Sequence, residues 1–165
     1  MYQLFLRLHF LSDIKNFTKY FKKYKYYYLD NKIDWVSLSR LETLSEDFIR
    51  EFKDHVDWSD ISCSQILTQD FIREFKDRVD WKEISYYQTL SEDFIREFKE
   101  RVYWSETSYQ RLSEDFIREF KDHVDWTSIS QRQILSEDFI REFKDMVNWR
   151  WILHRHLHLQ ENLEF

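Results

Sequence analysis

One string of residues, LSEDFIREFKD, repeats along the sequence. It begins at Leu44, Leu112 and Leu135, returns at Leu90 with Glu100 as its last residue, and appears at Leu67 as LTQDFIREFKD. Tryptophan follows the same period, in steps of 23, 23, 23, 22 and 23 residues, at Trp35, Trp58, Trp81, Trp104, Trp126 and Trp149. Tandem repeats of this length are typical of stacked architectures, in which one unit alone cannot bury its apolar face.

The first half of each unit has the pattern of a short capped helix. Ser45 is a good N-cap, and the carboxylates of Glu46 and Asp47 suit the positive end of the helix dipole. Arg50 is spaced to form ion pairs with Glu46 and Asp54. Apolar residues then fall at helical spacing, which predicts a repeat core containing the six tryptophans and these phenylalanines: Phe48, Phe52, Phe71, Phe75, Phe94, Phe98, Phe116, Phe120, Phe139 and Phe143.

The second half of the unit predicts another helix. Asp57 is a second N-cap candidate, and Trp58, Ile61 and Gln65 follow at helical spacing. The alternative is one long helix, because the chain contains no glycine or proline. A sustained coiled coil needs a period near 3.5 or 3.67 residues, however, and 23 residues is a multiple of neither. We therefore predict an all-α fold of tandem 23-residue helix-turn-helix repeats, stacked as an α-solenoid.

Three regions follow from this pattern. Residues 1–33 form a basic, aromatic N-terminal capping segment, residues 34–149 form the array of one degenerate lead-in and five close copies, and residues 150–165 form an amphipathic C-terminal cap. The unit that begins at Leu90 is one residue short, with Tyr103 at the position of Asp57 and Thr107 at that of Ile61. We expect local repacking or a kink there.

The composition argues against an enzyme. Phosphate loops, dinucleotide fingerprints and nucleophile elbows need glycine where a side chain would clash, and the sequence contains none. Cys63 is the single cysteine, so an intrachain disulfide or a cysteine-rich zinc site is not expected. The acid pairs recur in equivalent environments, whereas acid–base catalysis needs carboxylates whose pKa values differ. We predict no catalytic residue and no cofactor.

The copies differ most in their second helices. An exposed, variable face on a repeated frame suits partner binding, although it also suits mere tolerance of substitution. The candidate residues lie opposite Trp58 and Ile61 and their equivalents: Ser59, Asp60, Lys82, Glu83, Tyr86, Tyr87, Ser105, Glu106, Thr127, Ser128, Gln131 and Arg132.

The N-terminal segment differs from the repeats in charge. It carries seven basic and two acidic residues, a net charge of +5, whereas the whole chain has a net charge of −6. An apolar stripe that ends at Tyr28 predicts a helix after Ser12, and alternation from Tyr2 to Phe10 permits a short strand. We expect the helix to cover the first repeat. Its alternatives are binding of anionic membrane or nucleic acid through Lys15–Lys32, and contact with the acidic repeats of a second copy.

The C-terminal segment contains closely spaced histidines. His154, His158 and Glu161 have a spacing that can hold a metal, but surface histidines near a terminus are the simpler interpretation, so we predict no metal site. No apolar run approaches 18 residues, and the first residues lack the features of a signal peptide. We expect an intracellular protein that neither crosses a membrane nor is secreted.

The LSEDFIREF and VDWxxIS strings resemble short tandem repeats in uncharacterised proteins of large, AT-rich DNA viruses. The resemblance covers roughly residues 33–149 and implies a viral setting, without an activity to transfer. The sequence thus predicts a non-enzymatic scaffold or interaction protein with an unidentified protein partner. A binder of anionic surfaces is the first alternative. An enzyme of unrecognised type, which would need a cleft in the short Leu90 unit, is the second.

Overall fold

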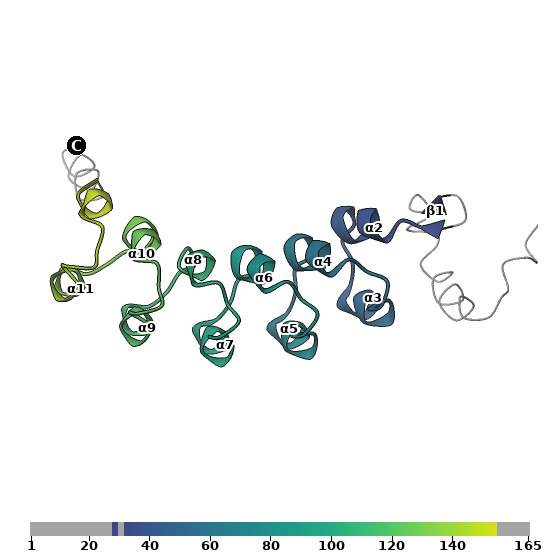
Figure 1. Cartoon of the computed structure of the whole chain (residues 1–165), viewed down its shortest axis with the longest axis horizontal. Helices are drawn as coiled ribbons and strands as arrows, with labels where there is room; N and C mark the ends of the chain where they lie inside the picture. The colour runs from purple at the N-terminus through teal and green to yellow at the C-terminus, as the bar shows by residue number, and fades with distance from the viewer. Residues whose placement is uncertain (1–27, 30–31, 155–165) are drawn as a thin grey trace, which may run out of the picture. The chain divides into compact units, whose positions relative to one another are not determined.

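The computed structural model describes residues 28–29 and 32–154 (Figure 1). A two-residue strand β1 (Tyr28–Leu29) pairs antiparallel with β2 (Lys32–Ile33), with Tyr28 opposite Ile33. The sequence pattern placed Tyr28 at the end of a helical stripe, and this is wrong, because its backbone pairs with β2. The predicted strand at residues 2–10 and the basic helix lie outside the described residues.

Short helices follow in alternation. The tryptophan helices, each beginning at a tryptophan, are α2 (Trp35–Leu41), α4 (Trp58–Ser64), α6 (Trp81–Tyr87), α8 (Trp104–Thr107) and α10 (Trp126–Arg132). The phenylalanine helices, which carry the repeated string, are α3 (Glu46–Glu51), α5 (Gln69–Glu74), α7 (Glu92–Glu97), α9 (Glu114–Glu119) and α11 (Glu137–Glu142). Residues 149–154 are also helical.

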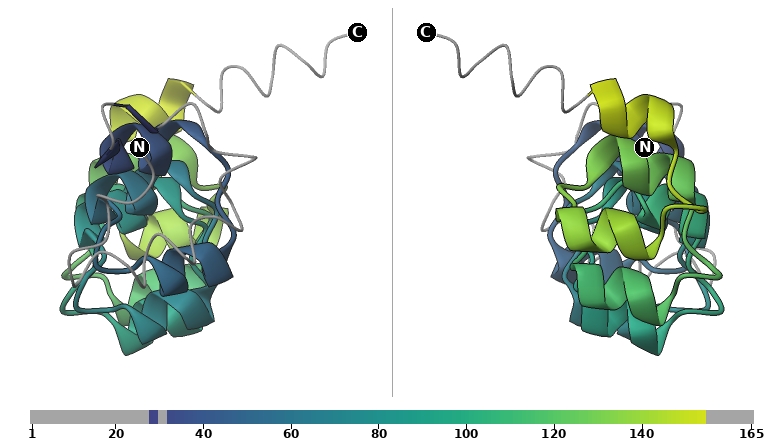
Figure 2. Two further views of the ribbon diagram at one scale, coloured as in Figure 1. Left: turned by 90° about the vertical axis from the view of Figure 1, so that its right-hand side faces the viewer. Right: turned by 90° about the vertical axis from the view of Figure 1, so that its left-hand side faces the viewer.

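The contacts divide the chain into two compact units, Met1–Val79 and Asp80–Phe165. In the first unit α2 packs beside α4, with α3 and α5 in a second row (Figures 1 and 2). In the second unit α6, α8 and α10 form one row and α7, α9 and α11 the other. Two short helices per repeat, stacked on the next pair, confirm the predicted helical repeat fold in each unit and exclude one long helix.

Side-chain caps explain where the helices begin. Ser45 Oγ accepts a hydrogen bond from the Phe48 N–H at 3.2 Å, and Asp57 Oδ1 accepts from the Asp60 N–H at 3.0 Å, so both predicted caps are confirmed. The phenylalanine helices are shorter than the apolar stripe suggested, because α3 ends at Glu51. A turn follows, in which the Val56 N–H donates to the Phe52 carbonyl at 3.1 Å and Val56 is buried.

Phenylalanine side chains form the centre of the core in each repeat. The two rings of a phenylalanine helix lie 4.7 Å apart, as in Phe48–Phe52 and Phe116–Phe120. All ten of the core phenylalanines named above are buried except Phe98, which is half-buried. The Trp104 ring packs at 5.0 Å on Phe120. Such aromatic pairs add to the free energy of area burial.

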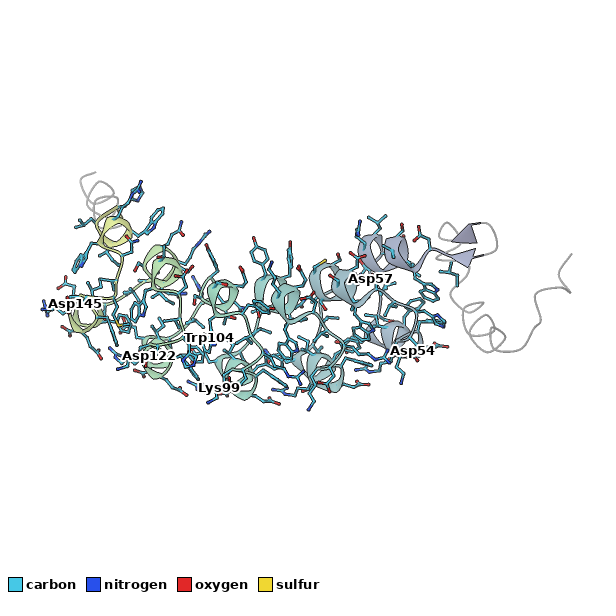
Figure 3. All side chains as sticks on the ribbon, in the orientation of Figure 1. Asp54, Asp57, Lys99, Trp104, Asp122 and Asp145 are labelled. Atoms are coloured by element: carbon cyan, nitrogen blue, oxygen red, sulfur yellow. The ribbon has the colours of Figure 1, made fainter. Side chains whose placement is uncertain are left out.

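The tryptophans lie at the edge of the core and not at its centre. Trp35, Trp58, Trp81, Trp104 and Trp126 are half-buried, and Trp149 is 47% exposed. The polar edge of the indole explains this position, because Nε1 of Trp58, Trp104, Trp126 and Trp149 donates to a backbone carbonyl five residues earlier in the chain. The Trp104 Nε1 bond to the Lys99 carbonyl is 3.2 Å long, and both residues are labelled in Figure 3.

The short unit is repacked locally, as predicted. Helix α8 has only four residues, and its N-cap residue, Tyr103, makes no side-chain capping bond. Ser108 still follows Trp104 by four residues, as Ser130 follows Trp126, so the missing residue falls after Ser108. The helix ends early, and Gln110 reaches the place that Gln133 occupies one repeat later.

Candidate functional site

Within each unit, a buried serine joins one tryptophan helix to the N-terminus of the next. Ser108 Oγ donates to the Trp104 carbonyl at 2.6 Å and accepts from the Asp125 N–H at 3.0 Å. Ser130 does the same between Trp126 and Asn148, at 2.6 and 2.8 Å. These serines are inaccessible to solvent, so each hydroxyl satisfies two backbone groups and fixes where the next cap begins.

A glutamine at the end of a tryptophan helix joins two repeats. Gln65 Oε1 accepts from the Leu44 N–H at 2.9 Å, and its Nε2 donates to the Ser39 and Glu42 carbonyls at 2.8 and 2.7 Å. Gln110 and Gln133 make the equivalent contacts in the second unit. The helical spacing of Trp58, Ile61 and Gln65 predicted an amphipathic helix but not these contacts of Gln65. A glutamine recurs near the end of each copy, and this recurrence could have indicated a structural role.

The repeated acids also act between repeats. The Glu46 carboxylate accepts from the Thr68 N–H at 2.7 Å, and that of Glu114 accepts from the Ser136 N–H at 2.6 Å. These glutamates therefore reach the N-terminus of the next phenylalanine helix, as well as lying in the first turn of their own. By contrast, Asp47 is exposed and contacts Arg50 of its own helix at 3.2 Å.

The repeated arginine completes this junction. Arg50 Nε donates to Glu74 at 2.8 Å, and its guanidinium lies 5.0 Å from the centre of the Phe71 ring. The hydrogen bond to Glu74 raises the pKa of Arg50 above its usual value. The expected Arg50–Asp54 ion pair is wrong, since Asp54 binds Arg78 at 2.6 Å. That hydrogen bond lowers the pKa of Asp54.

These contacts decide which of the predicted binding residues are available. Asp60 and Ser128, expected on the exposed face, are buried. Asp60 contacts Arg40 at 3.0 Å, and the Ser128 hydroxyl donates to the capping Asp125, so these two side chains are part of the packed repeat and not of an exposed surface. The other candidates are exposed or half-buried: Ser59, Lys82, Glu83, Tyr86, Tyr87, Ser105, Glu106, Thr127, Gln131 and Arg132.

Part of this face forms an aromatic surface in the second unit. Tyr86, Glu106, Tyr109 and Arg132 line one shallow hollow. The Arg132 guanidinium lies 5.1 Å from the centre of the Tyr109 ring, and Tyr87 meets Tyr86 edge-on at 4.7 Å. We call these five residues the tyrosine surface. Tyr109 was not among the predicted binding residues, although it follows Trp104 by five residues as Tyr86 follows Trp81.

The tyrosine surface is open to solvent. Tyr86 is 60% exposed and Tyr109 is 46% exposed, which is unusual for large rings on a frame whose other aromatic residues are mostly covered. The polar groups around these rings are of both signs, because Glu106 and Arg132 line the same hollow. Rings with hydroxyl groups, a guanidinium and a carboxylate together suit a polypeptide surface that offers apolar and polar contacts.

Other kinds of site find little support among the residues that the structure describes. Within 28–29 and 32–154, no three metal-binding side chains gather. His154 packs against Trp151, while His158 and Glu161 lie outside the described residues. Cys63 Sγ lies 3.2 Å from the Ser64 hydroxyl. No described helix is long and apolar enough to span a bilayer.

No family model, no curated protein and no solved structure matches the chain.

Proposed function

We propose that this chain is a non-enzymatic interaction module that binds a protein partner through the tyrosine surface. The observation that carries the proposal is the shared hollow of Tyr86, Glu106, Tyr109 and Arg132, which comes from three successive tryptophan-helix segments. Tyrosine and arginine are enriched at the energetically dominant positions of protein interfaces. They bring large contact areas and lose few rotamers on binding.

The frame supports this proposal because it fixes the backbone beneath the surface. Ser85 and Ser108 join the three segments, because each hydroxyl bonds one backbone group of its own helix and one of the next segment, at 2.6–3.0 Å. A surface carried on a fixed backbone loses less conformational entropy on binding. The viral and intracellular setting that the sequence suggests is part of the same proposal. Binding of anionic surfaces through Lys15–Lys32 stays a prediction, since most of that segment lies outside the described residues.

Affinity capture from the native cells tests the proposal. The bait is the full chain, compared with a Tyr86→Ser/Tyr109→Ser/Arg132→Ala variant. We expect the variant to lose a specific partner by at least about tenfold, because interface tyrosines and arginines often contribute about 2 kcal/mol or more.

The matched control is Leu41→Ser/Ile66→Ser, which removes two exposed apolar side chains from the first unit. It should retain the partner. Capture of the same proteins by all three baits, with circular dichroism showing equal helicity, would rule out the tyrosine surface as the binding site.

A further inference from the structure

Three junctions between consecutive phenylalanine helices, α3–α5 in the first unit and α7–α9 and α9–α11 in the second, use the same three contacts. A glutamate accepts the N–H of the next helix's cap residue, an arginine donates to a glutamate of the next helix, and the same arginine covers a phenylalanine ring there. For α9 and α11 the contacts are Glu114 with the Ser136 N–H at 2.6 Å, Arg118 with Glu142 at 2.8 Å, and Arg118 with the Phe139 ring at 5.0 Å.

The same residue types recur on α11, with no such helix described beyond it. The Arg141 side chain is 73% exposed, against 34% for Arg118, and Glu137 is 80% exposed, against 27% for Glu114. Arg141 contacts only carboxylates of its own helix, Asp138 at 2.9 Å and Glu137 at 3.6 Å, within the part of the chain that the structure describes. Both side chains are therefore accessible for intermolecular contacts.

Trp149 completes the surface. At the interior positions the tryptophan ring packs on the phenylalanine pair of the following helix, as Trp126 does on Phe143 at 5.0 Å. Trp149 has no ring partner among residues 32–154, although its Nε1 still bonds the Lys144 carbonyl at 2.9 Å. The indole is thus held in the orientation of its counterparts while 47% of the residue is exposed.

We propose that Glu137, Arg141 and Trp149, here called the end face, bind a helix of another polypeptide that carries the repeat's own motif. The motif is a Ser or Thr cap, a phenylalanine three residues later, a glutamate three residues after that, and a second phenylalanine, as in Ser113, Phe116, Glu119 and Phe120. Three interior junctions, Arg50–Glu74, Arg96–Glu119 and Arg118–Glu142, already show this helix on this set of side chains.

Charge and apolar area favour the same partner. Among the described residues, the Arg141 guanidinium has no carboxylate from a neighbouring helix. The exposed carboxylate of Glu137 can accept from an N–H donor, which the first turn of a helix supplies. The Trp149 ring needs an apolar ring to cover it. A helix with the motif offers all three groups at the spacing seen between α9 and α11.

A labelled peptide tests this inference. The probe is a capped peptide of residues 112–125 with an N-terminal dye, titrated with the full chain and followed by fluorescence anisotropy. We expect saturable binding that weakens at least about tenfold with the Trp149→Ala chain, since a central aromatic residue commonly dominates an interface. Arg141→Glu should weaken it roughly fivefold or more, through the lost cation–π contact and the new repulsion.

A charge exchange provides the sharper result. The peptide change Glu119→Arg should also weaken binding to the unchanged chain, and combining it with the Arg141→Glu chain should restore affinity to within about threefold. If the unchanged chain self-associates and the Arg141→Glu chain does not, the helix comes from a second copy of this chain. That result would support the inference.

The control variants separate this surface from the tyrosine surface. Tyr86→Ser/Tyr109→Ser/Arg132→Ala should leave peptide binding unchanged, and Trp149→Ala should leave partner capture by the tyrosine surface unchanged. Binding no stronger than that of a scrambled peptide, or binding that is indifferent to both Trp149→Ala and Arg141→Glu, would overturn the inference without affecting the proposed function.

Discussion

At the scale of single residues, buried polar side chains specify how one repeat meets the next. Gln133 is almost fully buried, yet its amide contacts the Leu112 N–H at 3.2 Å and the Ser108 carbonyl at 3.3 Å, together with the Gln110 carbonyl. The contact with the Ser108 carbonyl is buried, so that this carbonyl would otherwise lack a partner away from water. A buried polar group without a hydrogen-bond partner destabilises a protein by more than a satisfied one stabilises it. Loss of the glutamine side chain would therefore be costly mainly because it leaves backbone groups unpaired.

Replacing Gln133 with leucine should therefore destabilise the chain although it adds apolar surface. We expect the free energy of unfolding to fall by about 2 kcal/mol or more, since one donor and two acceptors lose their partner. Urea denaturation followed by circular dichroism measures this. Gln131→Leu, on the same helix and half-buried, is the matched control and should change the free energy by less than about 0.5 kcal/mol. Equal effects of the two changes would contradict the role given to Gln133.

At the scale of secondary-structure elements, capping sets the lengths of the helices. The seven-residue tryptophan helices α2, α4, α6 and α10 begin after an aspartate whose carboxylate accepts one or two backbone N–H bonds. Helix α8 begins after Tyr103, without a capping bond, and has four residues. The deletion after Ser108 shortens the same helix at its other end, so both ends of α8 depart from the repeat pattern.

Restoring the cap should stabilise this element. Tyr103→Asp supplies the acceptor found at Asp125, and a cap of this kind contributes about 1 kcal/mol. Tyr103 is exposed, so little burial is lost. We expect the free energy of unfolding to rise by about 0.5–1 kcal/mol, measured by urea denaturation. Tyr103→Ala removes the same ring without adding an acceptor and should give no gain. A gain from alanine as large as that from aspartate would show that capping is not the cause.

At the scale of the whole molecule, each unit depends on contacts between consecutive repeats. In the second unit, α7 relies on α9 through Arg96–Glu119 at 2.8 Å and through Glu92, which accepts the Ser113 N–H at 2.6 Å. Repeat arrays owe their stability to the sum of such neighbouring interfaces, because a single helix pair buries too little area.

Shortening the chain tests this dependence. Removal of residues 112–165 should lower the mean helicity per remaining residue at 222 nm, because α7 and α8 lose the repeat that follows them. Each lost hydrogen bond at this junction contributes about 0.5–1.5 kcal/mol, and the Trp104 ring also loses its contacts with Phe116 and Phe120, at 6.3 and 5.0 Å. Removal of residues 155–165 alone is the control and should leave that helicity unchanged. An unaltered signal per residue in the longer truncation would show that the repeats fold independently.

The sequence by itself determined the repeat, the two helices per unit and their caps. Local interactions carry this information, since Ser45 and Asp57 each cap a helix within three residues of themselves. The apolar spacing likewise located the buried phenylalanines, because side chains on one helical face share one environment. The sequence also showed that the unit beginning at Leu90 is one residue short. The structure shows that the tryptophan helix of this unit, α8, ends early as a result.

Only the tertiary structure decided which polar residues are packed between repeats and which remain exposed to solvent. Asp60 and Tyr86 both fit an exposed helical face, yet Asp60 is buried against Arg40 and Tyr86 lies in the open hollow. Gln65, Glu46 and Arg50 likewise bind partners that lie 20 or more residues away. Helical periodicity fixes which residues share a face, but what that face meets depends on the register between repeats, which packing alone sets.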